Sequence, residues 1–406
     1  MTQGALTGLK VIEFGEFISG PYCGKLLADL GAEVVKIEKP GLGDKSRDWG
    51  PFPQDIPHPE KSGLFLYLNT NKLGATLNVG TAAGTKIFKE LMKWADILVE
   101  NNPPREMVKL GLDWERLHYH NSSLVMTSIT PFGQTGPYHD YKACDLISLN
   151  MSGEAYINPM GGVDDIERQA PLTVPGHACY FLAGLTGAVG TASAILAQRI
   201  NGTGRHVDVS EQEAALYAAP RQELVRFTCG EPLSKRTRQA GGAGSNMFAT
   251  RDGHIILLGF TEDFWRAQVE MMGNPEWASS DLFKDMAARR QNGSKLAVLI
   301  SDWMKQHTTN EVVEAARGKR IPMAVVQTVK EAIESNLLRE REYFVEVERE
   351  AVGTLTYPGA PYKLSATPWN IRRPAPLLGE HNEEVYCRIL GYSRTDLVRM
   401  RQAGII

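Results

Sequence analysis

The chain has 406 residues, of which 43% are hydrophobic and 22% are charged, and its formal net charge at pH 7 is −3. This balance is typical of a soluble globular protein, and the length favours two domains over one. The sequence contains no basic stripe, so we expect no nucleic-acid partner.

Nothing in the sequence predicts a membrane anchor or a metal site. The first six residues lack the basic segment and apolar run of a signal peptide. The most apolar stretch, residues 181–196, is rich in Gly and Ala and is too short to span a bilayer, so we interpret it as part of a buried helix. The five cysteines are scattered and form no CxxC pair. We therefore predict a cytoplasmic protein without a metal.

The first forty residues predict a strand–helix–strand unit. Residues 9–14 form an apolar strand, a helix begins at Gly20-Pro21 and ends before Gly31, and residues 33–38 form a second strand. Such a unit implies a parallel sheet that is covered by helices on both faces.

The same alternation continues to about residue 220. The further predicted strands are residues 75–78, 96–100, 124–129 and 205–209. The predicted helices between and after them are residues 84–94, 183–200 and 210–217, the last of them capped by Ser210. This pattern predicts an α/β fold.

The pattern changes from residue 221 onward. Residues 235–245 are basic and rich in glycine, and residues 247–258 predict a hairpin that turns at Asp252-Gly253. The predicted helices that follow are residues 262–272, 281–291, 295–306, 380–390 and 395–403. We predict a large domain whose first part is residues 1–220, a small α+β domain with linkers in residues 221–324, and a return segment, residues 325–406, that completes the large domain.

Five blocks of sequence, in a fixed order, resemble the class III CoA-transferases. The blocks are the opening segment (Leu9–Phe14, Gly20-Pro21, Leu30–Glu38, Gly43-Asp44 and Arg47), Asn69–Lys72, Ala95–Asn101, Gly136–Tyr138 and Pro376–His381. The resemblance implies a Rossmann-like large domain and a small domain carried on two linkers. It also implies ring-shaped subunits that interlock as a dimer.

The resemblance implies that CoA or an acyl-CoA is a substrate, with no covalently bound cofactor. The positions that match the family's CoA contacts are Lys39, Lys72, Asn101, Asn102, Lys109 and Lys142. Lysines supply charges for a phosphate-rich ligand. For any one of the four alone we favour a solvated surface residue, and for the set as a whole we favour contact with CoA. The segment 241–244 matches the family's glycine loop over the active site, and its alternative is a linker turn.

The family's nucleophilic aspartate is missing from this sequence. That carboxylate attacks an acyl-CoA thioester, forms a mixed anhydride and then carries CoA as an enzyme thioester. Keeping Gly184, Gly190 and Gly202 in register places Tyr180 at this position, and a shift of three residues places His177 there. A tyrosine with a pKa of about 10 is neutral at pH 7 and forms no acid anhydride.

Other groups remain as candidate replacements. The acids are Glu16, Asp140 and Glu154, and for each the alternative is a solvated loop carboxylate. The racemase branch of the family uses a histidine where this sequence has Cys144, beside Asp145, which we interpret as structural. Cys179 precedes Phe181-Leu182, and we interpret it as a small buried residue.

We predict a non-catalytic or helper subunit of a heteromeric class III CoA-transferase, paired with an aspartate-bearing paralogous subunit. The resemblance to aspartate-lacking subunits of such enzymes implies succinyl-CoA as donor and benzylsuccinate as acceptor acid. Two alternatives stay open. One is a homodimeric CoA-ester isomerase or lyase that uses Glu16 or His177, and the other is a non-enzymatic acyl-CoA-binding protein.

Overall fold

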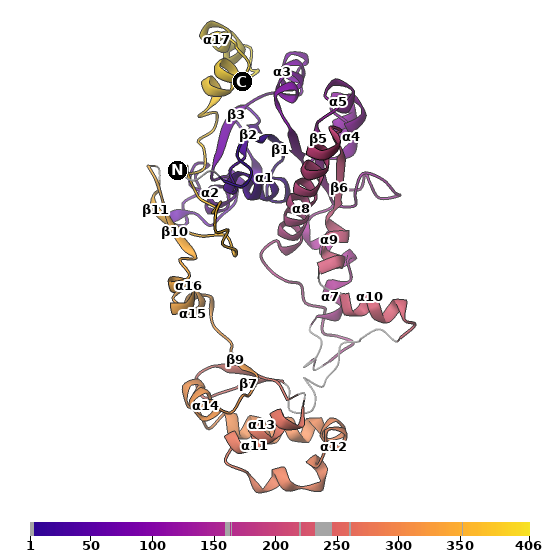
Figure 1. Cartoon of the computed structure of the whole chain (residues 1–406), viewed down its shortest axis with the longest axis vertical. Coiled ribbons are helices and arrows are strands. Elements are labelled where there is room, and N and C mark those ends of the chain that lie inside the picture. Colours follow the sequence, from indigo (N-terminus) through magenta and orange to yellow (C-terminus); the bar gives the residue numbers. More distant parts are fainter. Residues whose placement is uncertain are drawn as a thin grey trace. The chain divides into compact units, whose positions relative to one another are not determined.

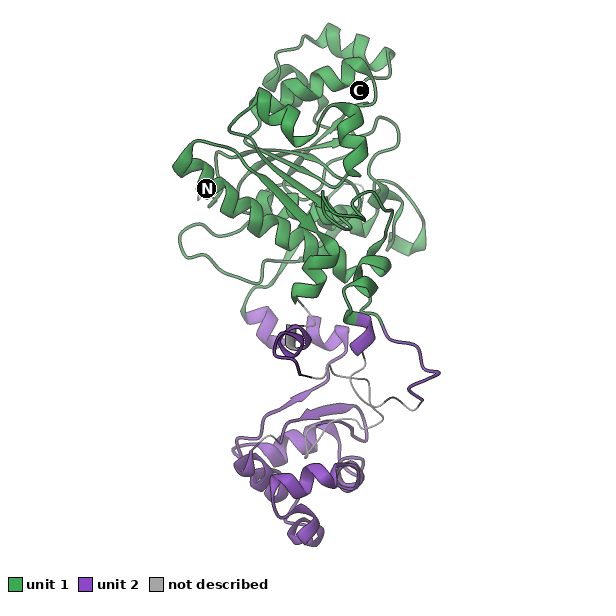
Figure 2. Cartoon of the chain, turned by 90° about the vertical axis from the view of Figure 1, so that its right-hand side faces the viewer, with its two compact units in different colours: residues 1–154, 173–221, 341–406 green, residues 155–172, 222–340 purple. Residues whose placement is uncertain are grey.

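The chain forms two compact units (Figures 1 and 2). The computed structural model describes residues 4–158, 163, 165–218, 221–231, 246–259, 261–350 and 352–406. The larger unit consists of Met1–Glu154, Thr173–Arg221 and Arg341–Ile406, and the smaller unit of Ala155–Leu172 and Gln222–Glu340. The larger unit is therefore assembled from three pieces of chain.

A six-stranded parallel sheet forms the centre of the larger unit, with the strand order β3-β2-β1-β4-β5-β6. The strands are β1 (Lys10–Phe14), β2 (Glu33–Glu38), β3 (Lys72–Thr76), β4 (Ile97–Glu100), β5 (Val125–Thr130) and β6 (His206–Ser210). In the central strand, Ile12 pairs with Val35 of β2 and with Leu98 of β4. The predicted mixed α/β fold is confirmed.

Both faces of this sheet are buried, which explains the nearly continuous apolar strands in the sequence. Val11 and Ile12 are both 0% exposed, yet they belong to different hydrophobic clusters. Neighbouring side chains of a strand point to opposite faces, so the two clusters lie on opposite sides of the sheet. A strand with apolar residues on both sides needs helices on both sides.

The helices supply that cover. Cluster residues from α1 (Ser19–Asp29) and α8 (Ala178–Asn201) pack on the Val11 face. The Ile12 face is covered by α3 (Ala82–Trp94), α5 (Trp114–His120), the C-terminal π-helix (Glu384–Ile389) and α17 (Arg394–Gln402). The larger unit also contains α2 (Gly63–Leu68), α4 (Pro104–Leu110), α6 (Asp145–Met151), α9 (Glu211–Ala218) and the 3₁₀ turns Lys45–Asp48 and Pro53–Asp55. Helices α7 (Glu154–Ile157) and α10 (Arg221–Thr228) belong, except for their first residues, to the smaller unit.

Helix α8 is longer than the sequence predicted. With 24 residues it is, among the described helices, the one long and apolar enough to cross a membrane, so the expectation that this stretch is too short was wrong. Its Ala183 and Ile195 nevertheless belong to the sheet cluster, as expected of a core helix. At Gly184 an added Cβ would lie 2.7 Å from the carbonyl oxygen of Ser19, so α1 and α8 approach closely only because this residue is glycine.

The smaller unit contains a three-stranded antiparallel sheet of β7 (Asn246–Ala249), β8 (His254–Leu257) and β9 (Met323–Val325). Ala249 pairs with His254 across the predicted Asp-Gly turn, which confirms the hairpin. The helices are α11 (Glu262–Met271), α12 (Met286–Gln291), α13 (Gly293–Met304), α14 (Thr309–Ala316), α15 (Val329–Ile333) and α16 (Asn336–Glu340), with 3₁₀ turns at Glu276–Ser279 and Asp281–Phe283. Back in the larger unit, β10 (Phe344–Arg349) and β11 (Gly353–Pro358) pair and pack on α2.

Candidate active site

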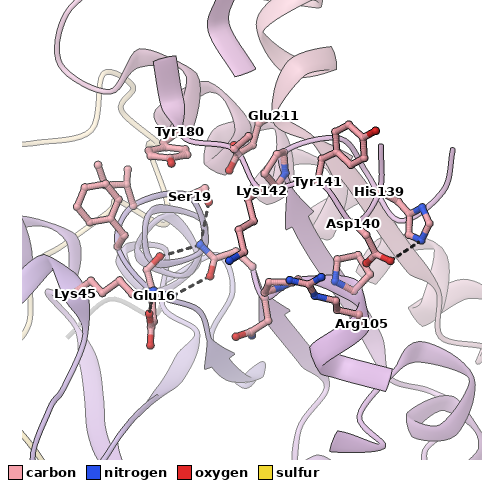
Figure 3. A pocket seen from close by; sticks show the side chains of 18 residues that line it. Glu16, Ser19, Lys45, Arg105, His139, Asp140, Tyr141, Lys142, Tyr180 and Glu211 are labelled. Atoms are coloured by element: carbon pink, nitrogen blue, oxygen red, sulfur yellow. Dashed lines mark hydrogen bonds and ion pairs between the residues drawn. The ribbon is translucent and has the colours of Figure 1, made fainter. Parts of the chain in front are cut away.

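A cavity of about 420 Å³ lies at the carboxyl ends of the strands of the parallel sheet, and we call it cavity A (Figure 3). Its lining includes residues that follow four strands: Phe17 after β1, Asn101 after β4, Pro131 after β5 and Glu211 after β6. Strand order changes direction between β1 and β4. Open α/β sheets bind ligands in the crevice at such a switch point.

Two asparagine side chains hold the β1–α1 loop, which lines cavity A, in place through hydrogen bonds. Asn101 accepts a hydrogen bond from the backbone N–H of Glu16 (2.9 Å) and donates to the Glu16 carbonyl oxygen (2.8 Å) and to the Ser19 hydroxyl (3.0 Å). Asn102 donates from Nδ2 to the Phe14 carbonyl oxygen at 2.7 Å. Both asparagines line the cavity, but their amides are already engaged in holding the β1–α1 loop.

A second cavity of about 320 Å³, cavity B, adjoins the first, because Glu16 and Asn102 line both. Exposed Lys39 and Lys109 line cavity B, whereas exposed Lys142 lines cavity A. The structure thus brings five of the six predicted CoA-contact residues to the walls of two neighbouring cavities.

Lys72 lies apart from those five. Its side chain is 0% exposed, and Nζ lies 2.7 Å from Glu13 Oε2 and donates to the Pro21 carbonyl oxygen at 2.7 Å. Lys36 reaches the other oxygen of Glu13 at 2.9 Å. Burial lowers the pKa of Lys72 to about 8, against the opposing effect of Glu13. This lysine therefore neutralises a buried carboxylate beneath α1 and lines neither cavity.

Tyr180 lies in the first turn of α8, is half-buried, and lines cavity A. Its backbone N–H donates to Asp145 Oδ1 at 3.1 Å, so Asp145 caps the helix and has the structural role expected for it. Burial raises the pKa of the Tyr180 phenol well above its usual range, and the charge of Glu211 adds to this shift as the second-largest cause. The phenol is therefore a neutral hydrogen-bond donor at physiological pH.

Aromatic rings gather beside Tyr180. The Phe17 ring lies 5.3 Å from Trp49, 5.3 Å from His177 and 5.8 Å from Tyr180, centroid to centroid. Phe17 and His177 both have left-handed backbones, with φ of 67° and 59°. Such conformations cost on the order of 1–3 kcal/mol in non-glycine residues and concentrate at functional sites. Of this aromatic cluster, Phe17 and Tyr180 line cavity A, whereas His177 does not.

Glu211 is a residue of the cavity that the sequence argument missed. It is 3% exposed, and the Ser148 hydroxyl donates to its Oε2 at 3.2 Å. Burial raises the pKa of Glu211 to about 7, although hydrogen bonds from Ser148 and Ser19 lower it. Figure 3 shows its carboxyl beside Tyr180. Because it follows Ser210 at the start of a helix, its sequence context resembles an ordinary helix-terminal acid.

The other candidate nucleophiles are placed less favourably. Glu16 pairs with Lys45 at 2.7 Å, and Asp140 lies 3.3 Å from His139. Cys179 is 0% exposed and burial raises the pKa of its thiol, which confirms the buried interpretation.

Glu154 and Cys144 are not among the residues that line cavities A and B. Residues 241–244, the predicted glycine loop, lie outside the described residues. Within the described part of the chain, no group of three or more His, Cys, Asp and Glu is arranged to hold a metal ion.

Comparison with known proteins identifies relatives along the whole chain. The model of "CoA-transferase family III" matches residues 6–382. The beta subunit of a succinyl-CoA–L-malate CoA-transferase from Chloroflexus aurantiacus is 32% identical over 99% of this chain and 98% of its own. The BbsE subunit of a succinyl-CoA:(R)-benzylsuccinate CoA-transferase from Thauera aromatica is 31% identical over 94% of each chain. A CAIB/BAIF family protein from Brucella suis has the same fold, with a TM-score of 0.82 and 24% identity over 96% of this chain and 100% of its own.

Proposed function

The chain belongs to CoA-transferase family III, and on that premise we propose that it is the subunit of a heteromeric transferase that carries no nucleophilic carboxylate. The observation that carries this proposal is the neutral Tyr180 phenol on the wall of cavity A. The resemblance assigns the family's aspartate to this position. A phenol of raised pKa does not attack a thioester at neutral pH and forms no anhydride. The transfer step then needs a carboxylate from a partner chain.

We further propose that cavities A and B hold CoA. Five predicted contacts line them, and exposed Lys45 and Arg105 join Lys142 at cavity A. Phosphate groups need cations that keep their charge beside the ligand, and these side chains provide them. We leave Lys72 out of the proposed contacts because its ammonium is committed to Glu13.

The proposed partner is an aspartate-bearing paralogue, interlocked with this chain as ring-shaped subunits. Helix α8 supports this proposal, because Leu185, Val189, Leu196 and Ile200 are 47%, 61%, 64% and 74% exposed on an otherwise packed apolar helix. A run of exposed apolar side chains is characteristic of an interaction surface. Two of the relatives are named as subunits of transferases. The strand order supports a Rossmann-like large domain, and the domain limits 1–220, 221–324 and 325–406 remain a proposal.

We propose succinyl-CoA as the donor and an acid with an aryl group, such as benzylsuccinate, as the acceptor. The aromatic side chains of Phe17 and Tyr180 on cavity A support an apolar, ring-bearing acyl group. A cytoplasmic location follows from this role. One observation also favours a second function, a CoA-ester isomerase or lyase, because Glu211 places a buried carboxyl in the cavity.

The test is a transfer assay on the purified chain, alone and mixed with its aspartate-bearing paralogue. Succinyl-CoA and benzylsuccinate are supplied, and the CoA esters are separated by liquid chromatography. We expect no transfer by the chain alone and transfer in the mixture. Transfer by the chain alone would contradict the proposal, and thioester binding without transfer in any pairing would favour a non-enzymatic acyl-CoA-binding protein.

A further inference from the structure

The smaller unit has a free sheet edge at β9. In the strand order β7-β8-β9, no strand of the described residues pairs with the outer side of β9. The Val326 N–H donates to the carbonyl oxygen of His254 at 3.0 Å, across the β8–β9 pair. Because hydrogen bonding alternates along an antiparallel strand, the N–H and C=O groups of Met323 and Val325 point away from β8. They are therefore open to a further strand.

A cavity of about 390 Å³, which we call cavity C, lies beside this edge. Its apolar walls include Val313 and Ala316 of α14 and Met323 and Val325 of β9, and none of its described lining residues belongs to β8 (Figure 1 labels β9 and α14). Val325 is 39% exposed, although it lies opposite Ile255, which is 0% exposed. Residues directly opposite share one face of a sheet, so the core face ends in an apolar groove between a strand and a helix.

Cavity C carries positive charge at the end where β9 begins. Arg317 and Arg320 both line it and both are exposed. Arg317 pairs with Glu314 at 2.6 Å, whereas Arg320 forms no ion pair within the described part of the chain. An arginine beside an open groove is a ready partner for a carboxylate. The chemistry that fits this groove is therefore an extended backbone with apolar side chains and an acidic end.

We propose that β9 and α14 form a docking groove for an extended acidic peptide segment of another protein, which adds to the sheet as a fourth strand. The segment pairs in antiparallel direction with the open backbone groups of Met323 and Val325, places an apolar side chain in cavity C and sets a carboxylate beside Arg320. Because β9 has only three residues, these side-chain contacts must support the backbone pairing. The groove lies within the smaller unit, so the inference goes beyond CoA transfer and does not rest on it.

Peptide binding to the full chain tests this inference. The probe is a fluorescein-labelled peptide in which valine and threonine alternate between two terminal glutamates, and its fluorescence anisotropy is followed as the chain is added. In an antiparallel strand, the valines that point into cavity C also direct their N–H groups to β9, whereas the threonine N–H groups face solvent. We expect saturable binding that is weakened about tenfold or more by N-methylation of the valines and is unchanged by N-methylation of the threonines, because only the valine N–H groups form hydrogen bonds.

Variants of the chain test the same contacts from the other side. Val325→Pro removes an outward N–H, which an edge strand tolerates, and should weaken binding of the probe about fivefold. Arg320→Asn removes the cation and suits the left-handed backbone at this residue (φ 53°), so binding should weaken about threefold. Arg290→Asn removes an exposed arginine of α12 that does not line cavity C and should bind like the wild type. If Val325→Pro fails to fold, the arginine pair and the methylated peptides still test the groove.

The outcomes distinguish this inference from the proposed function. No saturable binding by the wild type, or equal binding of the valine-methylated peptide, would overturn the docking groove even if the chain supports transfer with its paralogue. Self-association in light scattering that Val325→Pro abolishes, without binding of the probe, would overturn it in favour of a second copy of this chain. Peptide binding with the expected pattern, in a chain that supports no transfer in any pairing, would support the groove and overturn the helper role alone.

Discussion

At the scale of single residues, the structure separates two lysines that the sequence treats alike. Lys39 is exposed at cavity B, whereas Lys72 is buried against Glu13. The sequence does not distinguish them, because Lys39 directly follows β2 and Lys72 begins β3. A lysine at the end of a strand has the same local context whether its ammonium points to solvent or to a buried acid. Burial of a lysine requires such a partner.

The two lysines should respond differently to the same substitution. Lys72→Met leaves Glu13 with Lys36 as its remaining cation and should destabilise the fold by about 3 kcal/mol, because a buried charge loses a partner. Lys39→Met should leave stability unchanged and weaken CoA binding about fivefold, as expected for an exposed charge contact. Urea unfolding and titration calorimetry measure the two effects. A stable Lys72→Met variant with weakened CoA binding would return Lys72 to the CoA site.

Glu211 predicts a specific pH dependence of stability. Its pKa is raised from 4.5 to about 7 in the folded protein, so the folded state binds more protons than the unfolded state between these values. The free energy of unfolding should therefore fall as pH rises from about 4.5 to 7, by about 3 kcal/mol for this group, and then level off. Glu100, whose pKa burial raises to about 7, adds a fall of the same sign.

Glu211→Gln removes the titration of Glu211 and leaves that of Glu100. The free energy of unfolding of this variant should therefore fall less steeply with rising pH than that of the wild type. Urea midpoints at pH 5, 6, 7 and 8 measure the difference, and Glu213→Gln is the control on the same helix. Parallel curves for Glu211→Gln and the wild type would show that this carboxyl does not hold its proton more tightly in the folded protein.

At the scale of elements, apolar periodicity predicted the central strands well and failed where a charged residue or a cap decides the boundary. Strand β2 has the predicted limits, but β3 begins at Lys72, three residues before the predicted extended segment, because its first residue is a buried charge. Residues 281–291 were predicted as one helix. The chain instead forms a 3₁₀ turn, and the Asp285 side chain caps a new helix at Met286.

The candidate site was predictable to a similar extent. Tyr180, Asn101, Asn102 and Lys142 do line cavity A. Asn101 and Asn102 directly follow β4, and Tyr180 lies in the first turn of α8. The role of Glu211 could not be predicted, since its importance comes from α6 and α1 closing over it rather than from its own sequence context. Its place directly after a parallel strand was the one available signal.

The contact between α1 and α8 should be sensitive to a single methyl group. Gly184→Ala places a Cβ 2.7 Å from a backbone oxygen of α1, and overpacking of this kind costs about 1–3 kcal/mol, reduced by about 1 kcal/mol of improved helix propensity. In Gly190→Ala on the same helix, the added Cβ lies 2.8 Å from a single side-chain atom, Val207 Cγ1, and from no backbone atom, so a smaller loss is expected. Thermal unfolding compares the two, and equal stability would mean that the helices are not tightly packed here.

At the scale of the whole molecule, the exposed apolar side of α8 should mediate assembly with the paralogue. Val189→Glu places a charge where we expect the partner chain and should weaken assembly by tenfold or more, because an unpaired charge is costly to bury. Val398→Glu, on α17, changes a residue of similar exposure (53% against 61%) on another helix and should assemble normally. Light scattering after size exclusion measures assembly. Normal assembly of Val189→Glu would place the interface elsewhere.

The central claim is that this chain has lost the thioester-attacking carboxylate of its family and relies on a partner for it. The most direct test is the intact mass of the protein after incubation with succinyl-CoA, for the wild type, Tyr180→Asp and the matched amide Tyr180→Asn. We predict an unchanged mass for the wild type and Tyr180→Asn, and a covalent acyl or CoA adduct on residue 180 of Tyr180→Asp. An adduct on the wild-type chain that maps to Glu211 or Glu16 would contradict the claim, because the chain would then possess a nucleophile of its own.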